Sequence, residues 1–343
     1  MQAQALVCDE GQQFSIEDVT LKPVAADEVL IRTAYSGVSI GTEFALIRDE
    51  ISWGPYPLCT GYMATGVIEA VGAEIDDLQI GDTVYSRGNN TNAMTLSDGT
   101  PVSCVSGAHA SHMVAKPHTT HGVAKLPAGV PLDVASMFVM PAVGLYGVDM
   151  ANPRMGEWVV VYGTGLIGLG VVAACAHRGC RVIAVDLDAE RLGVAEEMGA
   201  DHVIDGSTED VGAEIARLTP HGADVVFECT GLPTCIDPAI ALCRPYGKFV
   251  WQGNYGADPV SLHFLVPHGK RLRMFFPCDD GLQPCRRAVL KNMAMGALDW
   301  EKTITHRISY TQAPVIYERI NSGDHDVLGM IINWGSGPAS AAW

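Results

Sequence analysis

Basic residues are scarce in this chain of 343 residues. It has 22 lysines and arginines against 39 aspartates and glutamates, which gives a net charge of -17 with histidine neutral. A field of this sign repels polyanions, so we expect neither a nucleic acid nor an anionic membrane surface as a partner. The composition instead predicts a small-molecule ligand.

Long apolar runs are also absent. No stretch approaches the roughly 18 uninterrupted apolar residues of a membrane helix, and residues 1–7 lack the basic and apolar segments of a secretory signal. The ten cysteines are scattered, and several lie in apolar runs, where a free thiol packs as a small hydrophobic group. We therefore expect a protein of the reducing cytoplasm.

A glycine-rich motif stands out against this background. Residues 163–168 read Gly-Thr-Gly-Leu-Ile-Gly, after the apolar run 158–162 and before the helix-like stretch 169–177. The first glycine permits the tight turn from strand to helix, and the second lets the backbone approach a pyrophosphate. The third lets the helix pack closely against the strand. Asp186 ends the next apolar run, where a carboxylate accepts hydrogen bonds from ribose hydroxyls and repels a 2'-phosphate. The motif predicts a dinucleotide site that favours NAD over NADP.

The secondary-structure pattern changes at about residue 141. Before it, short β-branched segments such as 64–71 alternate with turns and predict a mostly β region. After it, strands and helices alternate, which predicts a doubly wound parallel sheet. The last segments are too few for a third core. We therefore assign 1–140 with 276–343 to one domain and 141–275 to a dinucleotide-binding domain.

This order of domains resembles the medium-chain dehydrogenase/reductase superfamily, which includes the zinc alcohol and polyol dehydrogenases. The resemblance spans essentially the whole chain. It implies an α/β fold with a GroES-like β-rich catalytic domain and a Rossmann domain, assembled as a homodimer or homotetramer. The motifs that carry it are the glycine loop and the segments 36–43, 57–72, 79–84, 107–114 and 140–142.

The chain departs from the zinc enzymes at the positions of their metal ligands. At those positions it has Ser39, Tyr62-Met63 and Met140. A hydroxyl, a phenol and a thioether are not the nitrogen, thiolate or carboxylate ligands that a catalytic zinc requires. The four-cysteine structural zinc lobe is also missing, because 85–105 contains only Cys104. We therefore expect no zinc, and we do not assign a metal site to the histidines at 109, 112, 118 and 121.

The Ser-Gly-Val-Ser-x-Gly-Thr-Glu string is most similar to a zinc-lacking branch that includes bacteriochlorophyllide a dehydrogenase. This resemblance implies NAD-dependent interconversion of a secondary alcohol and its ketone. We expect a sugar, a cyclitol or another polyol-like substrate. Met63 replaces a glutamate that is frequent in this branch, so we carry over the reaction type and leave the substrate open.

Without a metal, a side chain must take the hydroxyl proton. We predict Tyr62 or Glu43 as the acid/base, with Thr42 orienting the substrate and Ser39 as a hydrogen-bond partner. The alternative for Tyr62 is a core tyrosine whose hydroxyl is hydrogen-bonded within the protein. The alternative for Glu43 is an acidic residue that interacts with the dipole at a helix N-terminus. We also predict that four residues line the substrate cleft: Trp53, Tyr56, Arg87 and His109. The alternative for each is packing against the protein without contact to substrate.

On the cofactor side, the resemblance implies contacts from the glycine loop and from segments that follow later strands. An alternative for Thr230 and Gln252 is that they only cap strands. The predicted cofactor residues are Gly163, Thr164, Gly165, Leu166, Ile167, Gly168, Asp186, Arg191, Thr230, Gln252, Gly253 and Asn254.

Three other functions remain open. The first is reduction of a carbon–carbon double bond, as in the enoyl and quinone reductases of the same superfamily, but these enzymes usually favour NADPH, and Asp186 counts against them. Bound NAD can also be reduced and reoxidised in place, which gives a net epimerisation or elimination. A redox-sensing or structural NAD-binding protein is the non-enzymatic alternative.

Overall fold

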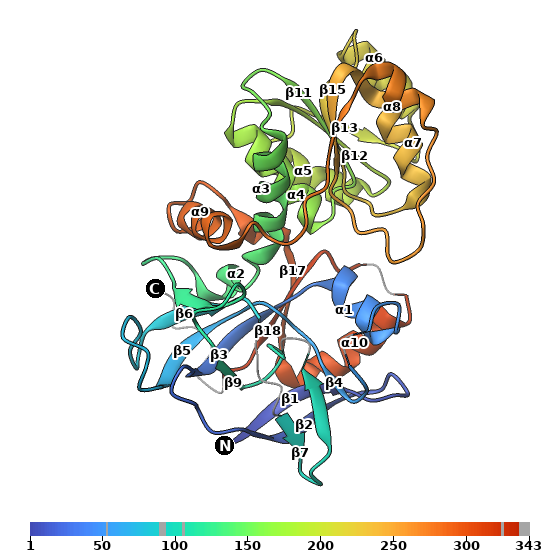
Figure 1. The fold of residues 1–343 in the computed structure, drawn as a ribbon. Helices are drawn as coiled ribbons and strands as arrows, with labels where there is room; N and C mark the ends of the chain where they lie inside the picture. The colour runs from blue at the N-terminus through green and yellow to red at the C-terminus, as the bar shows by residue number, and fades with distance from the viewer. Residues whose placement is uncertain (53, 89–93, 105–106, 324–325, 336–343) are drawn as a thin grey trace. The chain divides into compact units, whose positions relative to one another are not determined.

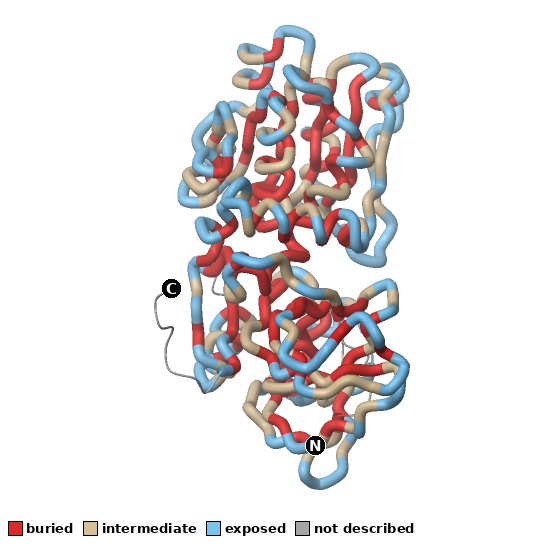
Figure 2. Tube along the Cα trace, turned by 90° about the vertical axis from the view of Figure 1, so that its left-hand side faces the viewer, coloured by how far each residue is buried: buried red, intermediate tan, exposed pale blue. Residues whose placement is uncertain are grey.

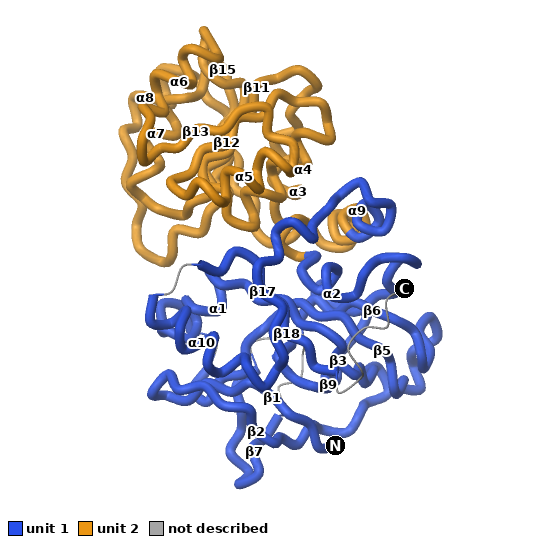
Figure 3. The backbone as a smooth tube through the Cα atoms, turned by 180° about the vertical axis from the view of Figure 1, so that it is seen from behind, with its two compact units in different colours: residues 1–138, 290–343 blue, residues 139–289 orange. Residues whose placement is uncertain are grey.

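The computed structural model describes residues 1–52, 54–88, 94–104, 107–323 and 326–335. The chain divides into two compact units (Figure 3). Unit 1 comprises Met1–Phe138 and Leu290–Trp343, and unit 2 comprises Val139–Val289. None of the helices in the described part of the chain combines the length and the apolar character that a membrane span requires.

Unit 1 contains a small closed barrel (Figure 1). Its strands follow the order β1 (Gln2–Cys8), β2 (Phe14–Leu21), β7 (Met94–Leu96), β8 (Pro101–Cys104) and β4 (Leu58–Cys59). Small and β-branched side chains such as Ala5 and Val19 fill its interior. Strand β4 leads into the segment that carries Tyr62.

A second sheet of unit 1 joins both ends of the chain. Strand β18 (Gly329–Asn333) pairs antiparallel with β3 (Val29–Val38), so the C-terminal return completes a sheet that the N-terminal part begins. Helix α1 (Ile40–Ile47) follows β3, and α10 (Ala313–Asn321) packs on the same apolar cluster. The strand order is β10 (Val123–Lys125), β6 (Thr83–Ser86), β5 (Ala64–Val71), β3, β18 and β17 (Ile304–Ser309), with β9 (His112–Ala115) paired to β3.

Unit 2 is a parallel sheet with helices between its strands, which confirms the predicted doubly wound architecture. The order is β13 (His202–Asp205), β12 (Arg181–Asp186), β11 (Trp158–Tyr162), β14 (Ala223–Glu228), β15 (Cys243–Trp251) and β16 (Arg273–Phe275). The central strands are nearly all buried, as their red colour in Figure 2 shows. The helices are α3 (Val139–Ala151), α4 (Leu166–His177), α5 (Ala189–Glu197), α6 (Val211–Leu218), α7 (Pro233–Leu242), α8 (Leu265–Lys270) and the first part of α9 (Leu282–Ala294). The remaining short helices, α2 (Leu132–Ala135), η1 (Trp300–Thr303) and η2 (Tyr310–Gln312), lie in unit 1.

The unit boundaries lie at 138/139 and 289/290, whereas the sequence pattern places them at 140/141 and 275/276. The second boundary comes later because the start of α9 belongs to unit 2. There the buried Arg286 guanidinium pairs with Asp280 through Nε at 2.8 Å, and the Cys285 thiol lies 3.6 Å from the carboxylate of Asp149 in α3. The contact with Asp149 ties the first turns of α9 to α3 of unit 2.

Candidate active site and cofactor loop

The glycine loop connects the end of β11 to the start of α4. Gly163 has a φ of +99°, and a Cβ there would lie 2.9 Å from the Thr230 side chain. A Cβ on Gly168 would lie 1.9 Å from the carbonyl oxygen of Gly163, so this position also excludes a side chain. By contrast, no atom lies within 4 Å of a Cβ built on Gly165, the N-cap of α4. The middle glycine is therefore the open one, as a backbone that receives a pyrophosphate requires.

Asp186 ends β12 and faces this loop. Its carboxylate accepts hydrogen bonds from the backbone amide and the hydroxyl of Thr164, at 2.6 and 2.8 Å, and from the amides of Leu187 and Asp188. Ribose hydroxyls would have to replace some of these donors to bind Asp186. The negative charge of the Asp186 carboxylate does not depend on which donors bind it. Arg191 pairs with Asp188 at 3.3 Å.

A buried carboxylate that the sequence analysis missed organises the other cofactor segments. Glu228 ends β14 without exposed surface, and it accepts hydrogen bonds from the amides of Thr230 and Gly231 and from the hydroxyls of Thr230 and Tyr255. The loop after β14 and the loop after β15 are thereby tied to one carboxylate. The sequence signal was available, because an acidic residue ends β14 just as Asp186 ends β12.

The segment after β15 lies at the same carboxyl edge of the sheet, where doubly wound folds bind their ligands. The Gln252 amide donates to the Val143 carbonyl in α3 at 3.1 Å. A Cβ on Gly253 would lie 2.4 Å from the amide nitrogen of Gly231, so the two loops are in close contact. Asn254 accepts from the Gly256 amide at 3.0 Å.

In unit 1, the structure brings together three of the four predicted catalytic residues. Ser39 is the N-cap of α1 and Thr42 lies in its first turn, and the hydroxyls of both act on the Tyr62 phenol and favour its ionised form. We call Ser39, Thr42 and Tyr62 the hydroxyl cluster. Burial raises the pKa of Tyr62, while the Arg87 guanidinium and the two hydroxyls act in the opposite direction. The Arg87 Cζ lies 4.6 Å from the centroid of the Tyr62 ring, within cation–π range.

Glu43, the fourth predicted catalytic residue, is enclosed. It has no exposed surface, and its Oε1 accepts a hydrogen bond from the Ser39 amide at 2.8 Å. Its Oε2 accepts from the Thr60 hydroxyl and His109 Nε2, both at 2.8 Å, and from the Tyr317 hydroxyl at 2.9 Å. Burial pushes the pKa of Glu43 upward, but His109 and these donors outweigh it and hold the pKa below its usual value. The carboxylate therefore stays ionised.

His109 belongs to the same enclosed network and has no exposed surface. Its Nδ1 lies 2.8 Å from the Ser36 hydroxyl, which accepts a hydrogen bond from the Trp334 indole at 2.8 Å. Both ring nitrogens are thus engaged inside unit 1, unlike those of a residue that lines a substrate cleft. Tyr317 and Trp334 come from the C-terminal return, and no local pattern in the sequence points to them.

Of the other residues predicted to line the substrate cleft, Tyr56 and Arg87 lie in the described part of the chain. Tyr56 donates its hydroxyl to the Ile47 carbonyl at 2.7 Å and packs against an apolar cluster. Arg87 lies over Tyr62, as described above. Trp53 lies outside the described residues.

The histidines suggested by sequence proximity do not converge. His112 lies 3.5 Å from Glu69 and His118 lies 3.2 Å from Asp77, each in a separate pair. Over the described ranges, no group of three or more His, Cys, Asp and Glu side chains is arranged to hold a metal ion.

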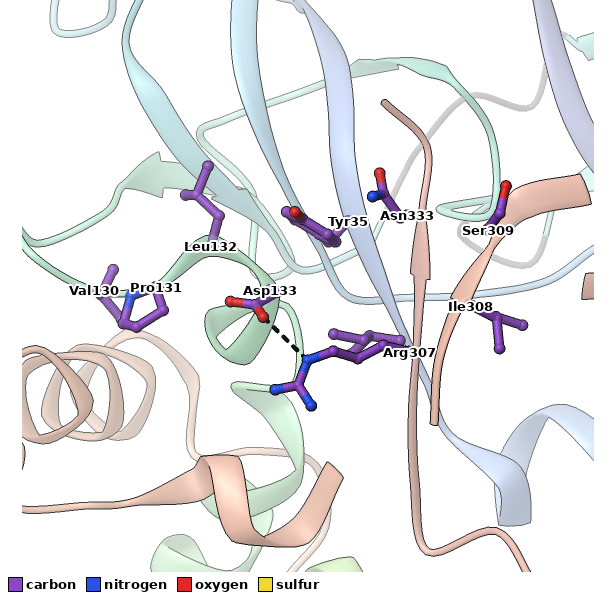
Figure 4. A pocket seen from close by; sticks show the side chains of 10 residues that line it. Tyr35, Val130, Pro131, Leu132, Asp133, Arg307, Ile308, Ser309 and Asn333 are labelled. Atoms are coloured by element: carbon purple, nitrogen blue, oxygen red, sulfur yellow. Dashed lines mark hydrogen bonds and ion pairs between the residues drawn. The ribbon is translucent and has the colours of Figure 1, made fainter. Parts of the chain in front are cut away.

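A cavity of about 730 Å³ lies in unit 1 beside β3, β17, β18 and the start of α2 (Figure 4). It is lined by Tyr35, Asn333 and the ion pair of Arg307 with Asp133, whose Nε–Oδ2 distance is 3.3 Å. No residue predicted for the catalytic or cofactor site lines it.

Two family models match the chain. The model of the alcohol dehydrogenase GroES-like domain matches residues 25–128, and that of the zinc-binding dehydrogenase matches residues 167–294. The chain is 25% identical to an (R,R)-butanediol dehydrogenase of Neisseria gonorrhoeae, over 93% of this chain and 96% of that protein. It is 27% identical to an erythritol/L-threitol dehydrogenase of Mycolicibacterium smegmatis, over 94% and 96%.

Solved structures share the fold. One is a zinc-binding dehydrogenase of Sinorhizobium meliloti 1021 bound to NADP, with a TM-score of 0.83 and 21% identity over 97% of this chain and 99% of that one. Another is a short chain alcohol dehydrogenase of Escherichia coli CFT073 complexed with NADH, with a TM-score of 0.82 and 20% identity over 97% and 99%. The GroES-like and Rossmann-like domains inferred from the sequence are thereby confirmed.

Proposed function

Because the chain belongs to the medium-chain dehydrogenase/reductase superfamily, we propose that it interconverts a secondary alcohol and its ketone with NAD(H) and without zinc. The observation that carries this proposal is the hydroxyl cluster of unit 1, in which a buried phenol meets two hydroxyls. The open backbone at Gly165 in unit 2 supports the cofactor half of the reaction.

The residues at the family's zinc-ligand positions do not fit the metal. The Tyr62 phenol is engaged by Ser39 and Thr42, and the Met63 side chain is buried. Glu43 has both oxygens occupied by donors, and none of these groups is the thiolate or free imidazole that zinc prefers. The proton chemistry is therefore assigned to side chains.

The residues of unit 2 fit a dinucleotide. The loop 163–168 would receive the pyrophosphate, and the charge of Asp186 favours NAD because a 2'-phosphate would be repelled there. When bound, NAD accepts the hydride that leaves the alcohol carbon, or NADH returns it.

Tyr62 moves the proton. In alcohol oxidation the Tyr62 phenol first releases its own proton through Ser39 or Thr42 to water, and the resulting phenolate takes the proton of the substrate O–H group. In ketone reduction the phenol donates its proton to the oxygen that becomes the product hydroxyl. Because burial raises its pKa, Tyr62 carries its proton at neutral pH and is ready to act as an acid. Arg87 and the two hydroxyls partly stabilise the phenolate that the oxidation direction requires. Ser39 and Thr42 connect the phenol to further hydroxyl groups of substrate or water.

We favour a vicinal diol or polyol as substrate. The support is the polar character of the hydroxyl cluster, together with relatives named for butanediol and for erythritol or threitol. A neutral substrate is also consistent with the net charge of -17, which disfavours strongly anionic ligands.

The direct test is turnover by the purified protein on butanediols, erythritol, threitol and other polyols, with NAD and with NADP, alongside elemental analysis. We expect oxidation of a secondary alcohol with NAD, and less than stoichiometric zinc. One tightly bound zinc per chain that activity requires would reject the zinc-independent mechanism. An absence of turnover on all alcohols and ketones with either cofactor would reject the proposed reaction.

A further inference from the structure

The Glu43 carboxylate spans the two segments that form the hydroxyl cluster. Its Oε1 holds the amide of Ser39, the residue that begins α1 and contributes one hydroxyl. Its Oε2 holds the hydroxyl of Thr60, two residues before Tyr62. One rigid planar group thus joins the backbone that carries Ser39 and Thr42 to the backbone that carries Tyr62.

We propose that Glu43 is a positioning residue, which sets the distance between these two segments and thereby aligns Tyr62 with Ser39 and Thr42. It does not exchange a proton with the substrate. This inference rests on the proposed function, because the alignment it describes serves proton transfer by Tyr62.

The Glu43 carboxylate acts as a brace between these two segments, and further contacts hold the segment that leads to Tyr62. Gly61 lies between Thr60 and Tyr62 with a φ of +88°, and a Cβ there would lie 2.8 Å from the ring of His109. The carbonyls of Thr60 and Gly61 also accept hydrogen bonds from the amides of His109 and Ala108, at 3.2 and 2.9 Å. The segment that leads to Tyr62 is therefore held on its side chain by Glu43 and along its backbone by the segment of His109.

The donors around Glu43 also exclude a direct role in the reaction. The Glu43 Oε2 accepts hydrogen bonds from the Tyr317 hydroxyl and from His109 Nε2 as well as from Thr60, and the whole carboxylate is buried. A substrate hydroxyl has no free acceptor there. The charged or titratable groups that act on Tyr62 itself are Arg87, over its ring, and Glu43, whose negative charge opposes formation of the phenolate.

Two substitutions at Glu43 separate position from charge. Glu43→Asp keeps the charge but shortens the brace by one methylene group, and Glu43→Gln keeps the length but removes the charge. We expect Glu43→Asp to lower kcat by roughly tenfold to a hundredfold, because misplacement of the Tyr62 segment by about 1 Å costs a rate factor of this order. Glu43→Gln loses one of the two oxygens that accept from the Ser39 amide and the Thr60 hydroxyl, so it should also lower kcat, by about tenfold, and KM for NAD should stay unchanged in both variants. The matched control is Glu28→Gln, which removes a buried carboxylate paired with Lys22 elsewhere in unit 1 and should leave kcat within about twofold.

A second readout does not depend on turnover. The alkaline titration of Tyr62 is followed by phenolate absorbance, as the difference between each protein and the same protein with Tyr62→Phe. Glu43→Gln should move this titration to lower pH, because the opposing charge is removed. Glu43→Asp should move it to higher pH, because the charge stays while the Ser39 and Thr42 hydroxyls lose their alignment with the phenol, and Glu28→Gln should leave it in place. A role limited to folding would leave the Tyr62 titration unmoved in all three.

Thr60 supplies the test if the Glu43 variants do not fold. Thr60→Val removes the hydroxyl on the Tyr62 side of the brace and should lower kcat by about tenfold, whereas Thr60→Ser keeps the hydroxyl and should retain kcat within about twofold. Unchanged kcat in Thr60→Val, or in both Glu43 variants, would overturn the positioning role. If wild type turns over no alcohol but Glu43→Gln still shifts the Tyr62 titration, the proposed function fails and the coupling of Glu43 to Tyr62 stands.

Discussion

Two buried carboxylates, Glu43 in unit 1 and Glu228 in unit 2, differ in how far along the chain their hydrogen-bond donors lie. Glu228 of unit 2 binds residues two, three and 27 positions away. Glu43 of unit 1 binds the nearby Ser39 but also His109 and Tyr317, at separations of 66 and 274 residues. A strand–loop–helix repeat assembles the proposed cofactor site of unit 2 locally, whereas the proposed catalytic site of unit 1 requires the C-terminal return to fold back on the N-terminal part.

The largest effect expected on the unit 1 side is from Tyr62→Phe. It removes the proposed proton carrier and should lower kcat by about 10²- to 10⁴-fold, while the dissociation constant of NAD stays unchanged. Steady-state kinetics and NAD titration measure the two quantities. Tyr56→Phe is the matched control, since that hydroxyl is bound to the Ile47 carbonyl. Equal activity of Tyr62→Phe and wild type would remove Tyr62 from the mechanism.

The stability of unit 1 should depend strongly on Glu43. Glu43→Ala leaves the buried donors of Thr60, His109 and Tyr317 without their acceptor and should lower the free energy of unfolding by about 3–5 kcal/mol. Denaturant unfolding measures this loss, with the exposed Glu301→Ala of the same unit as the control. A loss below about 1 kcal/mol would mean that the network contributes little to holding the C-terminal return.

Glu228→Gln tests the local counterpart in unit 2. One oxygen is lost while the amide keeps the size of the side chain, so the two loops it joins should loosen and NAD should bind about tenfold more weakly, or ~1.4 kcal/mol. Calorimetric titration with NAD measures the change. An unchanged affinity would show that Thr230, Gly231 and Tyr255 hold the loops without the carboxylate.

Asp186→Ser should relax the choice of cofactor. Removing the charge at the end of β12 should lower the ratio of kcat/KM for NAD over NADP by roughly tenfold, or ~1.4 kcal/mol. The same ratio in Asp188→Ser provides the control at the neighbouring carboxylate. If the ratio for Asp186→Ser equals that of wild type, the selectivity lies elsewhere.

The smallest expected effect is the acid dependence of the Glu43 contribution. Since the folded protein lowers the pKa of Glu43 from 4.5, its stabilisation is complete above that value and is lost as pH falls toward the folded pKa. The difference in unfolding free energy between wild type and Glu43→Gln should therefore shrink in acid. A difference that grows as pH falls would contradict the assignment of an ionised carboxylate.

Sequence reasoning located the fold class and one side of the site better than the other. The parallel sheet and the glycine loop follow from short-range patterns, because each strand, turn and helix is contiguous. The grouping of Ser39, Thr42 and Tyr62 followed from the family motifs. Thr60, Tyr317 and Trp334 had no such signal, since a hydrogen bond between distant segments leaves no period in the sequence. Glu43 and His109 were assigned contact with substrate, whereas the structure directs each toward the other.

The sequence by itself determined the order of the two kinds of unit, the dinucleotide loop and the absence of the usual zinc ligands from their positions. Each of these depends on the identity of a residue or on a contiguous pattern. Only the tertiary structure decided that the buried Tyr62 phenol meets the hydroxyls of Ser39 and Thr42 and that Glu43 is enclosed. The burial of Glu43 and its contact with Tyr317, 274 residues away, are consequences of packing, and packing leaves this carboxylate only the role of holding other groups in place.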